Sequence, residues 1–347
     1  MMAQEGYDSL PVQAPPRWRG VTGCAMVAAG SCTFTATAAG VKLASQPLLP
    51  LMQGRFLVSW LVALFALTLF NKCRSDQTLD WQGPQSVRYA LFLRGALYWG
   101  QVALWWLAVQ HLPLGDLTTA AQAAPVVTSL LAWRFLQESL SKHFLFVVVL
   151  ALAGAVLLGM GRGYEATNFD SSKVLGIIAF GGAFVAMSVL PLLVRTTRIA
   201  HWLEIEHVSA AVAALLMTPF ASVCDALSKV PNVEFSSEFL PQSPMDALIL
   251  GTMSFFALCM QTFGYQLAEA SIASFMWYVQ VPFSYSLQWV VFGLRPNAYA
   301  MLGASCLLCA AVLNVLGMQN EPQSELQIQL QEDSELICQE EEIVEKK

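Results

Sequence analysis

Charged residues are scarce in this chain. Asp, Glu, Lys and Arg make up only 12% of 347 residues, and there are four His. Soluble domains carry about 25% charged residues, so this chain cannot cover a water-facing surface with polar groups. Phosphate-binding GxxxxGK[ST] motifs are absent, and residues 1–20 lack the basic start and apolar core of a secretory signal peptide. ATP-driven transport, nucleic-acid binding and a soluble enzyme are all disfavoured.

Apolar residues are abundant instead, at 56% of the chain. They form ten segments, each near the roughly 20 residues that a membrane-spanning helix requires. We predict an all-α integral membrane protein whose ten transmembrane helices cover 21–41, 48–70, 90–109, 117–136, 143–161, 174–194, 207–224, 247–267, 271–293 and 299–318. Arg55 and Arg94 lie a few residues from the ends of their segments, so we expect their side chains to reach the membrane surface.

The net charge of −6 belongs to the C-terminal tail. Residues 319–347 hold nine acids and two Lys, which leaves the other 318 residues at +1. An excess of Lys and Arg marks the cytosolic side of a membrane protein. Nine such residues near segment ends lie on the side of the termini and five on the other, so we expect both termini in the cytosol.

The sequence also repeats with an offset of 157 residues. The matched residues lie in the fourth and ninth segments, and they are Pro125 and Pro282, Ser129 and Ser286, and Phe135 and Phe292. Because each half holds five segments, the second half is inverted relative to the first, an arrangement typical of secondary transporters. We predict two inverted five-helix repeats, 21–161 and 174–318, between an N-terminal tail, 1–20, and the acidic tail, 319–347.

At these residues the chain resembles the drug/metabolite transporter superfamily, specifically proteins with two EamA-type repeats. The resemblance is carried by Leu93-Arg94-Gly95 and by HLPLGDLTTAAQAAPVVTSLLAWRFLQESLS, residues 111–141. The second copy is degenerate, because Arg295 stands where Glu138 stands in the first. The branch that it resembles most is the eukaryotic solute carriers related to nucleotide-sugar transporters, although the late Lys-Thr pair of those sugar carriers is missing. The resemblance implies a transporter fold and leaves the substrate open.

Polar and aromatic side chains follow helical spacing in four segments. A Pro inside a helix frees a backbone carbonyl that lipid cannot satisfy, so both Pro residues should face protein or a wet cavity. We predict a substrate site near the bilayer midplane, formed by Tyr98, Gln101, Trp105, Thr118, Gln122, Pro125, Gln261, Tyr265, Trp277, Gln280 and Pro282. The alternative is that the amides are interhelical hydrogen-bond partners and that the Trp and Tyr residues form interfacial belts.

No acid is expected in the middle of any segment. A proton-coupled carrier often uses a buried carboxylate, so this pattern favours an exchanger or facilitator. The remaining candidates for a proton site are Glu206 and His207, at the start of the seventh segment. We expect no catalytic residue, metal or cofactor.

The tails carry two short sorting-like patterns. Tyr7-Asp-Ser-Leu10 fits Tyr-x-x-hydrophobic, and Glu332-Asp-Ser-Glu-Leu336-Ile337 fits acid-x-x-x-Leu-Leu/Ile. Both suggest sorting adaptors as partners and an endosomal, vacuolar or Golgi membrane, with the plasma membrane as the other option. The sequence therefore predicts a multi-pass secondary transporter of a small organic solute in a lipid bilayer, with no nucleic-acid partner; a homodimer is left open. The rival hypothesis is a non-transporting membrane adaptor that acts through its tails.

Overall fold

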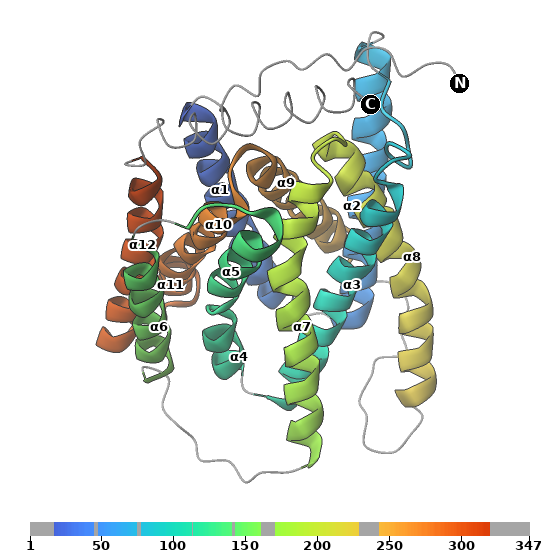
Figure 1. The fold of residues 1–347 in the computed structure, drawn as a ribbon. Helices are drawn as coiled ribbons and strands as arrows, with labels where there is room; N and C mark the ends of the chain where they lie inside the picture. Colours follow the sequence, from blue (N-terminus) through green and yellow to red (C-terminus); the bar gives the residue numbers. More distant parts are fainter. Residues whose placement is uncertain are drawn as a thin grey trace, which may run out of the picture.

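A computed structural model describes residues 17–44, 48–74, 78–112, 114–140, 143–160, 171–228 and 243–319. Within these residues all regular secondary structure is helical (Figure 1). The helices are α1 (Arg17–Ala44), α2 (Leu48–Cys73), α3 (Arg88–His111), α4 (Leu114–Ala121), α5 (Ala124–Leu136), α6 (Phe144–Met160), α7 (Ser171–Thr196), α8 (Trp202–Ser228), α9 (Pro244–Leu267), α10 (Ala270–Ala273), the 3-10 helix η1 (Ser274–Val279), α11 (Gln280–Phe292) and α12 (Ala298–Gln319).

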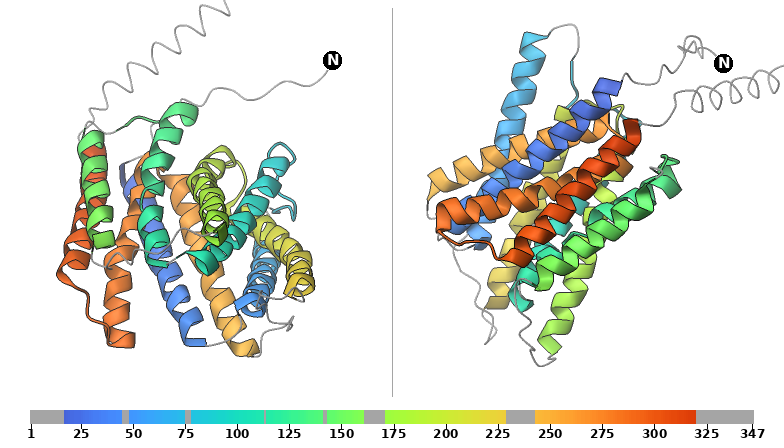
Figure 2. Two further views of the ribbon diagram at one scale, coloured as in Figure 1. Left: turned by 90° about the horizontal axis from the view of Figure 1, so that it is seen from below. Right: turned by 90° about the vertical axis from the view of Figure 1, so that its left-hand side faces the viewer.

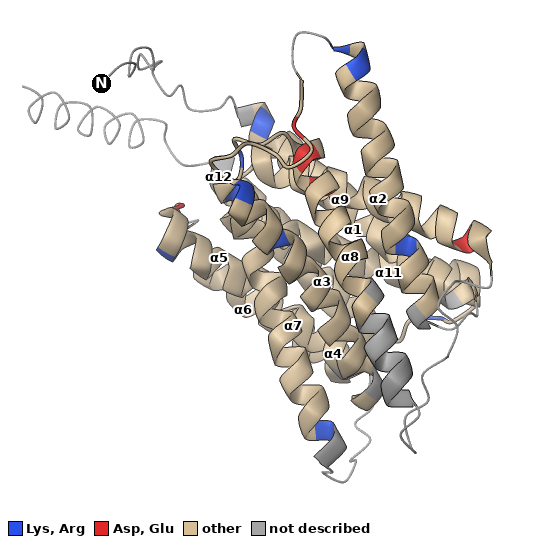
Figure 3. Ribbon diagram, turned by 90° about the vertical axis from the view of Figure 1, so that its right-hand side faces the viewer, with Lys and Arg blue, Asp and Glu red and all other residues tan. Residues whose placement is uncertain are grey.

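The helices form a bundle whose surface suits lipid. Five of them, α1, α2, α7, α9 and α12, are long and apolar enough to cross a membrane. Large apolar side chains point outward, including Phe65, Leu145 and Val290, which are 67%, 76% and 79% exposed. Figure 3 shows long stretches of helix without charge and charged residues mostly near helix ends. A soluble protein rarely exposes so much contiguous apolar surface, whereas a bilayer requires it.

Two predicted segments, 117–136 and 271–293, are interrupted helices. The first divides into α4 and α5 at residues 122 and 123, and the second consists of α10, η1 and α11. Pro125 is the second residue of α5, and Pro282 is the third residue of α11. Since the ring of Pro fits the first turn of a helix but not its interior, each Pro favours a new helix start at this place. At the first interruption, the Gln122 carbonyl accepts a hydrogen bond from the Tyr278 hydroxyl, so a side chain of the second interrupted segment satisfies a backbone group of the first.

When the helices of the second half of the chain are matched in order with those of the first, so that α7 corresponds to α1, α8 to α2 and α9 to α3, corresponding helices pack in the same way. Helix α1 packs against α9, as α3 packs against α7; α2 packs against α9, as α8 packs against α3. The pairs α2–α8 and α6–α12 each join one helix from each half (Figures 1 and 2). Helix α1 starts and α12 finishes at the same end of the bundle, here called the termini end (Figure 1).

Close backbone approach fixes the α6–α12 pair. A Cβ atom added at Gly154 would lie 2.9 Å from the carbonyl oxygen of Gly303, and one added at Gly303 would lie 2.7 Å from that of Gly154. Side chains larger than hydrogen would push the helices apart. Small residues serve this role in membrane proteins because tight van der Waals packing replaces the hydrophobic effect between helices.

Candidate functional site

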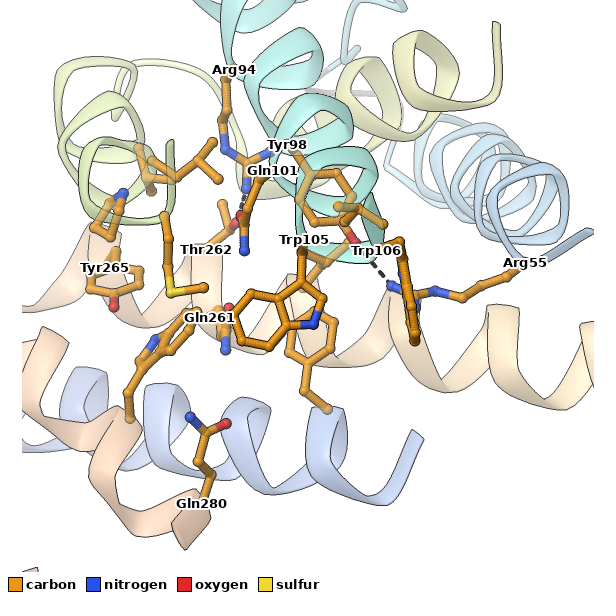
Figure 4. Close-up of a pocket in the computed structure, with 18 residues that line it drawn as sticks. Arg55, Arg94, Tyr98, Gln101, Trp105, Trp106, Gln261, Thr262, Tyr265 and Gln280 are labelled. Carbon is orange, nitrogen blue, oxygen red and sulfur yellow. Dashed lines mark hydrogen bonds between the residues drawn. The ribbon is translucent and has the colours of Figure 1, made fainter. Parts of the chain in front are cut away.

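An inner cavity of about 240 Å³ lies between the helices at the centre of the bundle (Figure 4). Its walls come from α1, α2, α3, α7, α9, η1 and α11. The polar and aromatic lining residues are Phe34, Arg55, Arg94, Tyr98, Gln101, Trp105, Trp106, Gln261, Thr262, Tyr265, Trp277 and Gln280. The rest of the wall consists of apolar side chains, those of Val102, Met187, Leu190, Pro191, Val194 and Leu258. An apolar space with a few convergent polar groups is the usual form of a small-molecule site.

An outer cavity of about 700 Å³ continues from the inner one. The two share Phe34, Trp105, Met187, Trp277 and Gln280. The outer cavity extends along α4 and α11 to residues 294–297, which connect α11 to α12 at the end of the bundle opposite to the termini (Figure 1). The inner cavity therefore has a route toward that opposite end.

Arg94 is neutralised by its surroundings. One of its Nη atoms donates to Glu206 Oε1 at 2.6 Å and to Thr262 Oγ1 at 2.8 Å, and the other donates to Ser209 Oγ. Thr262 also donates to Glu206. The Arg94 and Glu206 side chains are only 6% and 1% exposed. The cluster thus joins α3, α8 and α9 through a buried ion pair whose net charge is zero.

Arg55 has no such compensation. Its Nη2 atom donates to the Tyr98 hydroxyl at 3.2 Å, and Nη1 lies 3.7 Å from Met52 Sδ. Arg55 is only 9% exposed, and its Nε has no hydrogen-bond partner among the described residues. Figure 4 shows Arg55 reaching in from one side of the cavity and Arg94 from another.

The burial of both Arg residues corrects our expectation that they reach the membrane surface. Each lies in an inward-facing stripe of its helix rather than in the last turn, so its guanidinium meets protein before it meets water. The position of Glu206 also differs from expectation. The sequence placed it just before the seventh segment, but α8 already begins at Trp202, so Glu206 lies within this helix. Its charge is tolerated in the apolar bundle because Arg94 pairs with it.

At the termini end, an ion pair and hydrogen bonds around Glu138, here called the ties, hold helices together. Its carboxylate accepts from Arg195 Nε at 3.1 Å and from the backbone N–H of Ser271 at 2.8 Å. The Ser271 carbonyl in turn lies 2.7 Å from Ser129 Oγ and 3.3 Å from Asn314 Nδ2. These contacts join α5, α7, α10 and α12, from both halves of the chain.

The structure brings seven of the eleven proposed site residues into the inner cavity: Tyr98, Gln101, Trp105, Gln261, Tyr265, Trp277 and Gln280. Thr118 and Gln122 line the outer cavity, and the Gln122 amide donates to the Thr118 carbonyl. Pro125 borders a small space of about 10 Å³, and Pro282 lines neither this space nor the inner or outer cavity. The two Pro residues shape the interrupted helices rather than the cavity wall.

Some cavity residues were missed from the sequence. Arg55, Arg94 and Trp106 line the inner cavity, and Tyr278 donates a 2.8 Å hydrogen bond from its hydroxyl to the Gln122 carbonyl. An Arg within an apolar segment is a signal of function that was available in the sequence. The sorting residues Tyr7, Leu10, Glu332, Leu336 and Ile337 lie outside the described residues.

The sequence of this chain is similar to those of known transporter proteins. Residues 21–160 match the EamA-like transporter family. The chain is similar to solute carrier family 35 member G1 from mouse, at 27% identity over 65% of this chain and 61% of that protein, and from human, at 25% identity over 72% and 68%. The chain thus spans somewhat less than two thirds of the mouse relative. These matches confirm the resemblance to EamA-type proteins of the drug/metabolite transporter superfamily.

Two further similarities are more distant. A riboflavin transporter from Brucella anthropi is 20% identical over 66% of this chain and 78% of that protein. A solved crystal structure aligns with 88% of this chain and 99% of its own, at a TM-score of 0.65 and 17% identity, which supports the fold alone. The chain is therefore an integral, multi-pass membrane protein, and it is similar to a family of transporters, which is not a family of enzymes.

Proposed function

We propose that this protein is a secondary transporter that moves a small organic solute across a membrane by alternating access. The observation that carries the proposal is the inner cavity, which lies between helices of both halves of the chain and continues into an outer cavity toward the end opposite to the termini. Transporters of this type bind substrate between repeats at the midplane, beside interrupted helices. The solute-carrier and riboflavin-transporter names of its relatives support transport of a small organic solute.

The proposal includes ten transmembrane helices in two inverted repeats, 21–161 and 174–318. In it, α4 with α5 forms one span and α10, η1 and α11 form another. The exchangeable packing of the two halves supports this arrangement, as do the two Pro-started helices 157 residues apart. We also propose that tails 1–20 and 319–347 face the cytosol, in an endomembrane or the plasma membrane.

The site in this proposal consists of the inner-cavity residues together with Gln122 and Thr118 at its outer approach. The amides of Gln101, Gln261 and Gln280 would orient the polar part of the solute, and Trp105 and Trp277 would cover its apolar body. Since Trp105, Trp277 and Gln280 border both cavities, they stand where the solute would pass from one to the other.

Cysteine labelling tests alternating access without knowledge of the substrate. In a variant without the eight native Cys, Ser284→Cys places a thiol in the outer cavity and Val194→Cys places one in the inner cavity, near the termini end of α7. An impermeant thiol reagent is added to either side of sealed vesicles. A transporter should react at Ser284→Cys from one side and at Val194→Cys from the other.

The control is Ala186→Cys, which is buried on α7 but lines neither cavity, and it should stay unlabelled from both sides. A non-transporting adaptor needs no alternation, so its Val194→Cys variant would stay protected from the termini side. That outcome would refute the transport proposal and favour the adaptor hypothesis.

A further inference from the structure

The inner cavity has a net positive charge. The lining residues include two Arg and no Asp or Glu among the part of the chain that the structure describes. Glu206 cancels Arg94 through their 2.6 Å ion pair. No described carboxylate forms an ion pair with Arg55, which contributes one uncompensated positive charge.

A buried charge without a partner is costly in an apolar bundle. Removing a cation from water into a low-dielectric interior costs several kcal/mol even after relaxation, unless an opposite charge compensates it. Arg55 is 9% exposed, and its described contacts are with neutral groups: the Tyr98 hydroxyl, Met52 Sδ and the ring of Phe56, whose centroid lies 5.6 Å from Arg55 Cζ. Such a residue suits a cavity whose ligand supplies the missing negative charge.

The guanidinium and its neighbour form a recognition pair. Arg55 Nη2 donates to the Tyr98 hydroxyl, which leaves the hydroxyl proton free to point elsewhere in the cavity. A guanidinium matches the two oxygens of a carboxylate in a planar fork. Arg55 and Tyr98 together can therefore donate to one carboxylate.

The rest of the cavity suits a flat apolar body. Trp105, Trp106 and Trp277 line it, and an apolar cavity of roughly 150 Å³ is known to hold benzene. A volume of about 240 Å³ thus accommodates one substituted ring system. Tyr265 and Trp277 also line the cavity, and the Tyr265 hydroxyl can donate its proton to a ring substituent.

We propose that the inner cavity binds a small monoanionic organic acid, with its carboxylate on Arg55 and Tyr98 and its planar ring between Trp105, Trp106 and Trp277. One uncompensated positive charge matches one negative charge, whereas a dianion would leave an excess charge buried. This inference rests on the proposed transport function, since it names the class of solute carried.

Matched acid and amide probes test the inference. Benzoate, nicotinate and indole-3-acetate are compared with benzamide, nicotinamide and indole-3-acetamide, and terephthalate serves as the dianion. Binding to the purified full-length protein is measured by Trp fluorescence quenching and by the shift in melting temperature. At least one acid should bind about tenfold or more tightly than its amide, and the dianion should bind more weakly than benzoate.

Variants assign the preference to Arg55. Arg55→Gln should weaken binding of the best acid roughly 10- to 100-fold and leave its amide unchanged, because only the charged hydrogen bonds are lost. Arg55→Lys should retain part of the preference, and Tyr98→Phe should reduce it less than Arg55→Gln. The matched control is Arg134→Gln, which removes an exposed Arg and should bind like the wild type.

Unchanged amide binding shows that the cavity of Arg55→Gln is still folded. If no acid binds more tightly than its amide, or if Arg55→Gln retains the full preference, the inference is wrong. Failure of transport itself is seen separately, because the vesicle labelling of Ser284→Cys and Val194→Cys requires no ligand.

Discussion

The two ends of the helix bundle differ in how side chains hold the halves of the chain together. At the termini end, Glu138 binds Arg195 and the backbone of Ser271, and no described cavity extends past these ties. At the opposite end, the outer cavity separates α4 from α11 down to Arg295 and Asn297. One end is tied by charge, and the other is open.

The inverted repeat that we propose would account for this difference. With the offset of 157 residues, the position equivalent to Glu138 is Arg295, and the position equivalent to Arg195 is Ala38. Arg295 and Ala38 both line the outer cavity, and no ion pair of Arg295 occurs among the described residues. If the two halves are repeats, the second copy lacks the ion pair that Glu138 and Arg195 form in the first, and the outer cavity lies at that end.

We expect the largest effect from a substitution that breaks the buried ion pair between Arg94 and Glu206. Glu206→Ala leaves the Arg94 charge buried without a partner, which should cost roughly 3–5 kcal/mol of stability. Replacing both members, as Arg94→Met with Glu206→Leu, should recover much of this loss, because no charge then remains buried. The measurement is thermal unfolding of the purified variants.

The control for this pair is Asp80→Asn. Asp80 binds Arg88 at 3.2 Å, and both side chains are partly exposed, so the loss should be below about 1 kcal/mol. If Glu206→Ala is no more costly than Asp80→Asn, the buried pair does not stabilise the bundle as we argue.

A smaller effect loosens the tie itself. Glu138→Ala removes both acceptors and leaves Arg195 and the Ser271 N–H without them, so we expect a loss of about 1–3 kcal/mol. Because the ties close this end only, labelling of Val194→Cys from the termini side should become faster, and labelling of Ser284→Cys should not. Equal acceleration at both thiols would indicate general loosening instead of opening at one end.

Much of the fold could be predicted from the sequence because helix length and apolarity are local properties. Every predicted segment overlaps a helix, and the mid-segment Pro residues mark both interruptions. The repeat offset was also visible. The number of spans and the inverted symmetry stay predictions, since five helices meet the criteria for membrane spans by length and composition.

The site was less accessible to sequence reasoning because it depends on contacts between distant segments. Whether the charge of Arg94 is compensated depends on Glu206, 112 residues away in the sequence. The charge of Arg55 is recognised as uncompensated only when its spatial neighbours are known. Spacing on one helix predicted the polar faces but not which faces meet. Gln122 and Gln280 both line the outer cavity, but the Gln122 amide already donates to the Thr118 carbonyl.

This difference between the two Gln residues can be sharpened by mutation. Gln280 lies where the inner and outer cavities join, whereas Gln122 lines only the outer one. Gln280→Ala should weaken binding of the best acid probe by about 1–2 kcal/mol, and Gln122→Ala should not. Both should cost about 0.6 kcal/mol of stability at most, the average for interhelical hydrogen bonds. Equal affinity in Gln280→Ala and the wild type would remove this residue from the site.

We expect the smallest effect from a substitution that introduces an ion pair at the end opposite to the termini. Ala38→Glu places a carboxylate across the outer cavity from Arg295, at the position that the repeat offset makes equivalent to Arg195. An ion pair at such a partly exposed site contributes up to about 1 kcal/mol, so labelling of Ser284→Cys should slow by up to about fivefold. Ala38→Gln has a similar size but no charge, and it should leave the rate nearly unchanged. High salt should restore labelling in Ala38→Glu, because it screens exposed charges. If Ala38→Glu and Ala38→Gln slow labelling equally, the effect is steric, and the two positions do not correspond to the pair that closes the termini end.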